Sequence, residues 1–153
     1  VKLAIFIDSG KMDEVVNDIY NKCLLEMQCY TMFDYIRLLD TRIQRMQGSD
    51  GAKVRKMNFG MAIMALKAGY PIRRSGWNGK GLMVFKQVPA HIDSDIIPKM
   101  QSLPQSAKDL ILKGKGFIDY TSQCLIYNEN TGRADSWVPS ISDVFADDWE
   151  IVQ

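Results

Sequence analysis

Nine residues near the middle of the chain, RRSGWNGKG at positions 73–81, combine cationic, aromatic, amide and glycine groups in one short segment. Glycine and asparagine tolerate the left-handed backbone of tight turns. A purine stacks on a flat aromatic face, and its phosphates bind backbone N–H groups and cationic side chains. The segment therefore predicts a ligand-binding turn, with these candidate residues: Arg73, Arg74, Trp77, Asn78, Gly79 and Lys80.

A second tryptophan motif lies near the C-terminus. Trp137, followed by Ser140 and Asp143, would supply an opposite wall for the same ligand. The alternative for each indole is structural, because a buried tryptophan can anchor a tight turn. For Trp77 the sequence leaves both interpretations open, whereas for Trp149, in an expected terminal strand, we predict burial.

Catalytic chemistries have less support. The single histidine, His91, is remote in sequence from every cysteine, and no nucleophile–base triad can be assembled around it. The glycine turn matches neither the phosphate-loop spacing nor the dinucleotide-binding fingerprint. Asp143, Asp147, Asp148 and Glu150 could hold Mg²⁺ for nucleotide hydrolysis or transfer, but the helix dipole alone favours carboxylates in a capped first turn. We expect no enzymatic activity, no metal and no cofactor.

The composition restricts the class of protein. The chain has 153 residues, of which 46% are hydrophobic and 24% charged, and its net charge is +1. That net charge gives no reason to expect binding to a nucleic-acid polymer. The apolar run at 3–7 is too short to span a membrane and lacks a signal-peptide cleavage region. Three cysteines without a C-x-x-C pair indicate reduced thiols. We expect a cytoplasmic protein with no membrane partner.

Charge is distributed unevenly along the chain. Residues 67–115 contain nine Lys or Arg against three acids, whereas residues 116–153 contain one Arg against seven acids. One interpretation is that the two segments pair as neighbouring strands, within a chain or between subunits. The other is a focused anion site in the basic segment.

The chain divides at a glycine-rich stretch into an extension at 1–47, a linker at 48–56 and an α+β domain at 57–153. Residues 2–7 predict a strand, and apolar residues at helical spacing from Asp13 predict a long helix. Part of this helix alternates steps of three and four, at Cys29, Met32, Ile36, Leu39, Ile43 and Met46. That spacing predicts packing against another helix, in the same chain or a partner, or onto the chain's own core.

The sequence of residues 57–153 predicts a short helix packed on a mostly antiparallel sheet. Asn58 would cap the helix, Gly69 would close it, and Pro71 would stop it. A polar excursion at 92–115 would contain a helical turn or two, and Ser140 or Ser142 would cap a short helix before the last strand. The expected strands are 72–74, 82–88, 117–127, 134–138 and one starting at Trp149.

Two separated motifs resemble a family of small phage proteins, the second named group of Thoeris anti-defence proteins. The first motif joins the N-F-G-x-A helix start at Asn58 to the R-x-G-W-N-G-K-G turn ending at Gly81. The second is W-x-P-S-x-x-D-x-x-x-x-D-W, from Trp137 to Trp149. The resemblance covers residues 57–152, and residues 1–56 lie outside it.

The resemblance implies a non-catalytic sponge in the cytoplasm of a bacterial host. Members look like homotetramers that bind cyclic nucleotide-type immune signals between protomers. The signal is notably glycocyclic ADP-ribose, and some members also hold cyclic di- or oligonucleotides at separate sites. A homo-oligomer, dimer or tetramer, is therefore expected. The implied roles are stacking at Trp77, amide recognition at Asn78, phosphate contacts at Arg74 and Lys80, and an opposing wall at Trp137 and Asp143.

The alternative function is that of a phage interaction or assembly protein. It would use the N-terminal helix to join a complex, and the tryptophan turn would then be purely structural.

Overall fold

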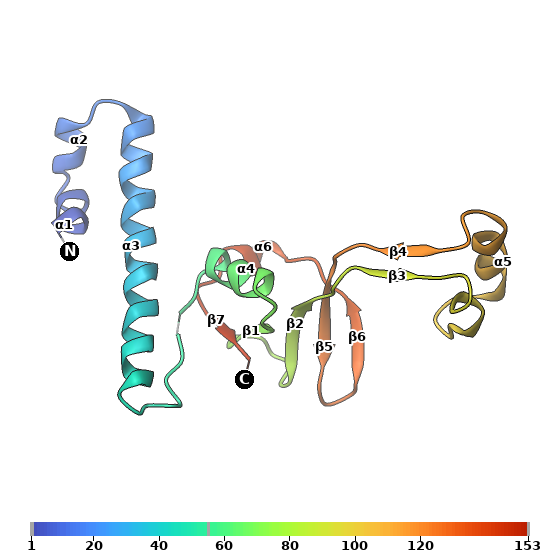
Figure 1. Ribbon diagram of the computed structural model, residues 1–153. Helices are drawn as coiled ribbons and strands as arrows, with labels where there is room; N and C mark the ends of the chain where they lie inside the picture. The colour runs from blue at the N-terminus through green and yellow to red at the C-terminus, as the bar shows by residue number, and fades with distance from the viewer. Residues whose placement is uncertain (1, 55, 153) are drawn as a thin grey trace.

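The computed structural model describes residues 2–54 and 56–152 and contains helices at the N-terminus followed by a mixed helix and sheet region (Figure 1). The first part comprises α1 (Lys2–Asp8), α2 (Lys11–Val15) and the 28-residue α3 (Ile19–Met46). Among the described residues, no helix combines the length and apolar character that crossing a membrane requires.

The predicted strand at 2–7 is wrong, because these residues form α1. Leu3 and Ala4 of α1 line a small hollow together with Cys29 and Phe33 of α3, so the apolar run packs on a helix. A strand needs a neighbouring strand for its N–H and C=O groups, whereas a helix pairs them internally. Since the described elements on which this segment mainly packs, α2 and α3, are helices, the helix is the conformation that leaves its backbone paired.

The predicted long helix is divided in two. Between α2 and α3 the chain is extended at Val16, and α3 begins after Asp18, whose side chain accepts a hydrogen bond from the Tyr20 N–H at 3.0 Å. This cap satisfies one of the N–H groups that a helix start leaves unpaired. The face of α3 that the three-and-four spacing predicted to pack on a helix contacts α1 of the same chain, near Cys29 and Ile36.

A five-stranded antiparallel sheet forms the centre of the second part. Its order is β6-β5-β2-β1-β7, and its strands are β1 (Ile72–Arg74), β2 (Leu82–Lys86), β5 (Cys124–Asn128), β6 (Arg133–Ser136) and β7 (Trp149–Ile151). Ile72 pairs with Val84 on one side and Ile151 on the other. The predicted α+β class and the mostly antiparallel sheet are thereby confirmed.

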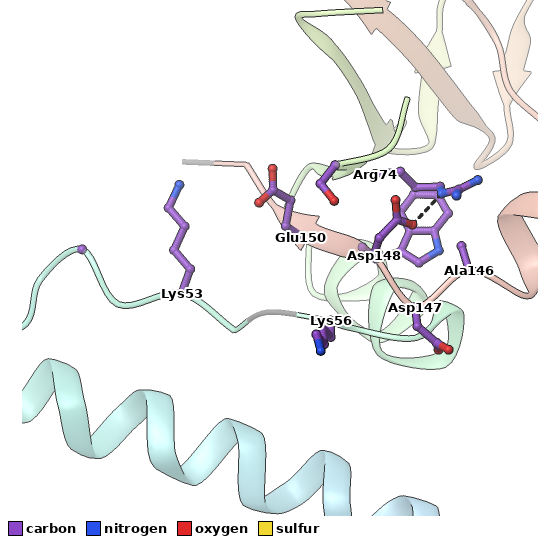
Figure 2. A pocket seen from close by; sticks show the side chains of 10 residues that line it. Lys53, Lys56, Arg74, Ala146, Asp147, Asp148 and Glu150 are labelled. Carbon is purple, nitrogen blue, oxygen red and sulfur yellow. Dashed lines mark hydrogen bonds and ion pairs between the residues drawn. The ribbon is translucent and has the colours of Figure 1, made fainter. Parts of the chain in front are cut away.

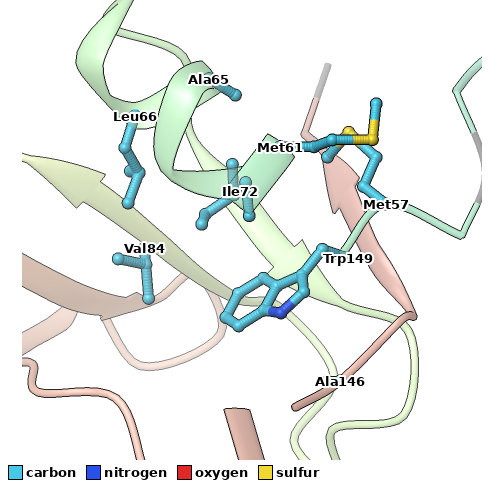
Figure 3. Packing of buried hydrophobic residues seen from close by; sticks show 9 residues of the cluster. Met57, Met61, Ala65, Leu66, Ile72, Val84, Ala146 and Trp149 are labelled. Atoms are coloured by element: carbon cyan, nitrogen blue, oxygen red, sulfur yellow. The ribbon is translucent and has the colours of Figure 1, made fainter. Parts of the chain in front are cut away.

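Helix α4 (Phe59–Lys67) covers this sheet and closes the core (Figure 3). The Asn58 side chain accepts from the Met61 N–H at 2.9 Å, and Gly69 adopts φ +89°, so the predicted cap and stop are confirmed. The buried cluster joins α4 to β1, β2 and β7 through Met57, Met61, Ala62, Ala65, Leu66, Ile72, Val84, Ala146 and Trp149. This core fixes where β1 ends and the glycine turn begins.

The predicted strand at 117–127 is two strands in different sheets. β4 (Ile118–Tyr120) pairs with β3 (Ala90–Ile92) in a two-stranded ribbon, while β5 pairs with β2. The ribbon projects from the main sheet and carries the short 3-10 helix η1 (Ile97–Lys99) and α5 (Gln105–Lys113) at its far end (Figure 1). The change of partner at 121–123 depends on tertiary pairing, which local residue pattern does not show.

Polar contacts fasten α3 to the start of α4. Asn58 donates its side-chain N–H to Asp34 Oδ2 at 2.7 Å, and Arg37 donates to Asp34 and to the Lys56 carbonyl. Asp34 therefore connects the long helix to the residue that caps α4.

We expect Asp34→Ala to loosen α3 from the domain without unfolding either part. The cap bond from Met61 to Asn58 remains, but the Asn58 amide and Arg37 lose their shared carboxylate. Trypsin should then cut after Lys53 and Lys56 several-fold faster in limited proteolysis. Asp40→Ala on the same helix is the control, and equal cleavage rates in the two variants would contradict this role.

Candidate functional site

Asp143 lies at the centre of a hydrogen-bond network beside the glycine turn. It belongs to the short helix α6 (Ile141–Val144), where Ser140 is the N-cap and the capping box is reciprocal. The Asp143 N–H donates to Ser140 Oγ at 3.2 Å, and the Ser140 N–H and hydroxyl donate to Asp143 Oδ2 at 3.0 and 2.7 Å. Ser140 rather than Ser142 is thus the cap, and one carboxylate oxygen is fully occupied by it.

Arg74 connects this carboxylate to a second one. Its Nη1 donates to Asp143 Oδ1 at 3.0 Å, and its Nε donates to Asp148 Oδ1 at 2.7 Å. Asp148 Oδ2 accepts from the Gly76 N–H at 2.8 Å. A Cβ at Gly76 would lie 2.6 Å from that oxygen, so the close approach requires glycine. The start of the turn is therefore fixed to the segment joining α6 to β7.

The three tryptophans meet above the same network. Trp149 is fully buried, as predicted, and its Nε1 donates to the Asp143 carbonyl at 3.1 Å. Trp77 and Trp137 each make an edge-to-face contact with Trp149, with ring centroids at 5.5 and 6.1 Å. Trp77 Nε1 also donates to Asp143 Oδ1 at 3.1 Å. The half-buried Trp77 therefore anchors the turn, which is the structural one of the two interpretations that the sequence left open for this residue.

Part of the turn faces a hollow of about 380 Å³, the turn hollow. Its lining residues are Arg73, Arg74, Ser75, Trp77, Gly79, Lys80, Gly81, Leu82, Glu129 and Glu150. Five of the predicted site residues are among them, whereas Asn78, Trp137, Ser140 and Asp143 are not. Asn78 is exposed, and the other three belong to the network behind the turn. The predicted residues thus fall into two groups, those that line the turn hollow and those in the hydrogen-bond and aromatic network that supports the turn.

The backbone of the turn has unused donors. Within the described parts of the chain, the N–H groups of Asn78, Gly79 and Lys80 donate no hydrogen bond to protein atoms. The Lys80 carbonyl, by contrast, is held by the Asn130 side chain at 2.5 Å. Consecutive free N–H groups next to a lysine are suited to bind an anion such as phosphate.

A larger hollow of about 870 Å³, the linker hollow, lies beside the same strand end (Figure 2). Figure 2 shows Lys53 and Lys56 on the segment between α3 and α4, with Asp148 and Glu150 on β7 and the residues before it. Arg74, Ser75 and Glu150 line both hollows. Sequence reasoning missed Lys53 and Lys56, since they sit in a linker and nothing local to them indicates a site.

The basic and acidic segments of the chain pair with each other around this site. Arg73 Nε lies 2.5 Å from Glu150 Oε1, and Arg74 contacts Asp143 and Asp148. Arg73 and Arg74 stand opposite Glu150 and Trp149 in the β1–β7 ladder. The interpretation of the uneven charge as pairing between neighbouring segments is confirmed for these residues.

These contacts change the pKa values of the carboxyl groups. Burial raises the pKa of Asp143, but hydrogen bonds from Ser140, Arg74 and Trp77 outweigh it and leave the pKa below its ordinary value. The pKa of Asp148 is lowered in the same way: burial opposes the shift, and Arg74 and the Gly76 N–H overcome it. Within 2–54 and 56–152, no three His, Cys, Asp or Glu side chains are grouped so that they could hold a metal ion.

Comparison with known proteins identifies the family of this chain. Residues 57–152 match the model of the Thoeris anti-defense 2-like domain, and residues 1–45 match a separate family model named Sequestin. A 102-residue stretch is 33% identical to Thoeris anti-defense 2 of Bacillus phage SP01, covering 63% of this chain and 96% of that protein. The chain therefore belongs to the Thoeris anti-defense 2-like family, and this membership supports a phage anti-defence role.

We expect the network to make the protein sensitive to acid. An aspartate in the unfolded chain has a pKa of about 3.9, above the folded pKa values of Asp143 and Asp148. Stability contributed by these carboxylates is present above that value and is lost as the pH falls through the lower folded values. The urea midpoint should therefore drop steeply below about pH 4.

The matched variants are Asp143→Asn and Asp95→Asn, since Asp95 is exposed. Asp143→Asn should cost on the order of 3 kcal/mol at neutral pH, because Arg74 loses a buried partner, and should flatten the acid dependence. Asp95→Asn should change neither. An Asp143→Asn chain that keeps the full acid dependence would show that other groups cause it.

Proposed function

We propose that this protein is a phage anti-defence sponge that binds a cyclic nucleotide-type immune signal and holds it without cleaving it. The observation that carries the proposal is the row of free backbone N–H groups at Asn78, Gly79 and Lys80 beside the turn hollow. Because this turn lies within residues 57–152, it belongs to the part of the chain that matches the anti-defense family.

The turn supplies donors suited to a phosphate. Lys80 is exposed and forms no ion pair with any described residue, so its charge is available, while Arg73 and Arg74 on the same hollow are already paired. A phosphate bound to the 78–80 backbone would therefore find one uncommitted cation and two guanidinium groups nearby.

The aromatic part of the recognition is held rigidly. Trp77 is fixed through its Nε1 and its edge-to-face contact with Trp149, and it lines the turn hollow, where we infer that a base stacks on it. A rigid stacking surface loses little conformational freedom on binding, which favours tight affinity. Hollows of about 380 and 870 Å³ lie within the range of roughly 300–1,000 Å³ that small ligands occupy.

Glycocyclic ADP-ribose is the first ligand to test, because it combines a purine with a pyrophosphate; cyclic dinucleotides are the second. Sequestration acts by mass action, so it requires affinity and copy number rather than a general acid or base. Arg74, Asp143 and Asp148 are positioned by one another, and we assign them the role of supporting the turn.

We expect purified protein to remove glycocyclic ADP-ribose from an ultrafiltrate and to release it chemically intact after heating. Chromatography of the filtrate and of the heat-released fraction measures both steps. Intact ligand recovered from the protein supports sequestration, whereas a degraded product indicates an enzyme. Ligand left free throughout contradicts the proposal and directs attention to the N-terminal helices.

Matched variants locate the binding residues. Asn78→Ala and Lys80→Ala change exposed side chains outside the supporting network, and each should weaken binding about tenfold or more by removing a charged or amide contact. Lys115→Ala, an exposed lysine on the projecting ribbon, is the control and should bind normally. Unchanged affinity in both turn variants, with melting temperatures also unchanged, would place the ligand elsewhere.

A further inference from the structure

Helix α3 exposes apolar side chains along its length. None of its 28 residues, all of which the structure describes, is buried. Tyr20, Leu24, Met27, Tyr35 and Leu38 have exposed fractions of 69, 44, 59, 61 and 36%. An amphipathic helix of a folded protein normally buries its apolar face, and a contiguous exposed apolar patch marks an interaction surface.

Two sides of α3 already have neighbours. α1 lies along one side, where Leu3 and Ala4 meet Cys29, Phe33 and Ile36 (Figure 1). The side that carries Asp34 and Arg37 is hydrogen-bonded to the segment at the start of α4.

The remaining side carries the α3 stripe: Tyr20, Leu24, Met27, Thr31, Tyr35, Leu38 and Arg42. Steps of three and four residues place these side chains on one continuous face of a helix. Asp34 borders this face, because it is three residues from Thr31 and four from Leu38. Tyr20, Leu24, Tyr35 and Arg42 lie away from both occupied sides, so that part of the face is available to a partner.

We propose that the α3 stripe docks antiparallel on the same stripe of a second copy of this chain. The stripe is symmetric about Thr31 in the sequence: Met27 and Tyr35 lie four residues from it, and Leu24 and Leu38 lie seven residues from it. A two-fold axis at Thr31 therefore sets Leu24 against Leu38 and Met27 against Tyr35. An isologous dimer requires this self-complementarity.

The ends of the stripe are complementary as well. Tyr20 and Arg42 each lie eleven residues from Thr31, so the same axis brings the Arg42 guanidinium to the face of Tyr20 in the other copy. Met27 against Tyr35 is likewise a favourable sulfur–aromatic contact. A single register thus gives every one of these side chains a favourable partner: leucine on leucine, methionine on tyrosine and arginine on tyrosine.

Charge selects the antiparallel orientation. Residues 13–26 contain four acids and one lysine, whereas residues 37–45 contain three arginines and one acid. Antiparallel docking places the acidic half of each helix beside the basic half of its partner, and parallel docking would place like charges together.

The exposed area is sufficient for a stable dimer. Together with the flanking Met46, the stripe presents six large apolar side chains, at roughly 100 Å² of exposed surface each. The sum is on the order of 600 Å² per copy, or about 1,200 Å² for the dimer, which is the lower end of the range that specific interfaces bury.

The test uses the full chain with Cys23, Cys29 and Cys124 replaced by Ala, and one new cysteine introduced. Thr31→Cys places thiols on the proposed axis, and Gln44→Cys places them on the same helix on the side of the linker. With a short bis-maleimide reagent at equal micromolar concentrations, we expect Thr31→Cys to crosslink at least tenfold faster. Equal rates overturn the proposal.

A second pair of variants tests register and orientation in sedimentation equilibrium. Leu24→Glu should raise the dissociation constant of the α3 contact at least tenfold, because the carboxylate faces Leu38 of the other copy. Leu24→Glu combined with Leu38→Lys should restore it, since each glutamate then meets a lysine. Circular dichroism checks that α3 stays folded, and failure of the double variant to recover in a folded chain overturns the antiparallel register.

Discussion

The ion pairs of Arg74 with Asp143 and Asp148 hold the glycine turn in place. One guanidinium joins the end of β1 to the first turn of α6 and to the residue before β7, segments about 70 residues apart in sequence. The same two carboxylates accept from the Trp77 indole and the Gly76 N–H. Since every carboxylate oxygen of Asp143 and Asp148 has a donor, the network orders the turn on which the proposed anion site would depend.

Rigidity at this point has a functional consequence. A sponge gains affinity when its binding groups are already ordered, because little conformational entropy is lost when the ligand arrives. Trp77 makes an edge-to-face contact with Trp149 and donates its Nε1 to Asp143, while the N–H groups of Asn78, Gly79 and Lys80 have no acceptor among the described residues. The anchoring interpretation of Trp77 does not exclude the proposed stacking role, because Trp77 also lines the turn hollow.

Local signals predicted the parts of the fold that depend on local chemistry. Asn58, Gly69 and Pro71 set the limits of α4, and Trp149 was expected to be buried. The strand predicted at 2–7 failed because an apolar run of that length suits a helix equally well when the neighbour is a helix. The division of 117–127 between two sheets depends on which strand lies opposite, and sequence pattern does not contain that information.

The candidate site shows the same limit. The residue types of the glycine turn predicted that Arg73, Trp77 and Lys80 form one site, and the structure brings them to one hollow. The sequence motif also predicted Asp143 as part of a ligand wall, whereas the structure shows its carboxylate oxygens bonded to Ser140, Arg74 and Trp77. The contribution of Lys53 and Lys56 comes from a linker folding back toward β7, a tertiary event that their sequence context does not indicate.

Hydrogen–deuterium exchange with and without glycocyclic ADP-ribose tests most directly whether the turn presents its free N–H groups to the ligand. We expect slowed exchange at residues 78–80, whose N–H groups have no acceptor among the described residues, and little change at Trp149, whose N–H is already bonded to the Met57 carbonyl. Ligand-dependent protection confined to other segments, with residues 78–80 exchanging at the same rate as in the free protein, would contradict this expectation.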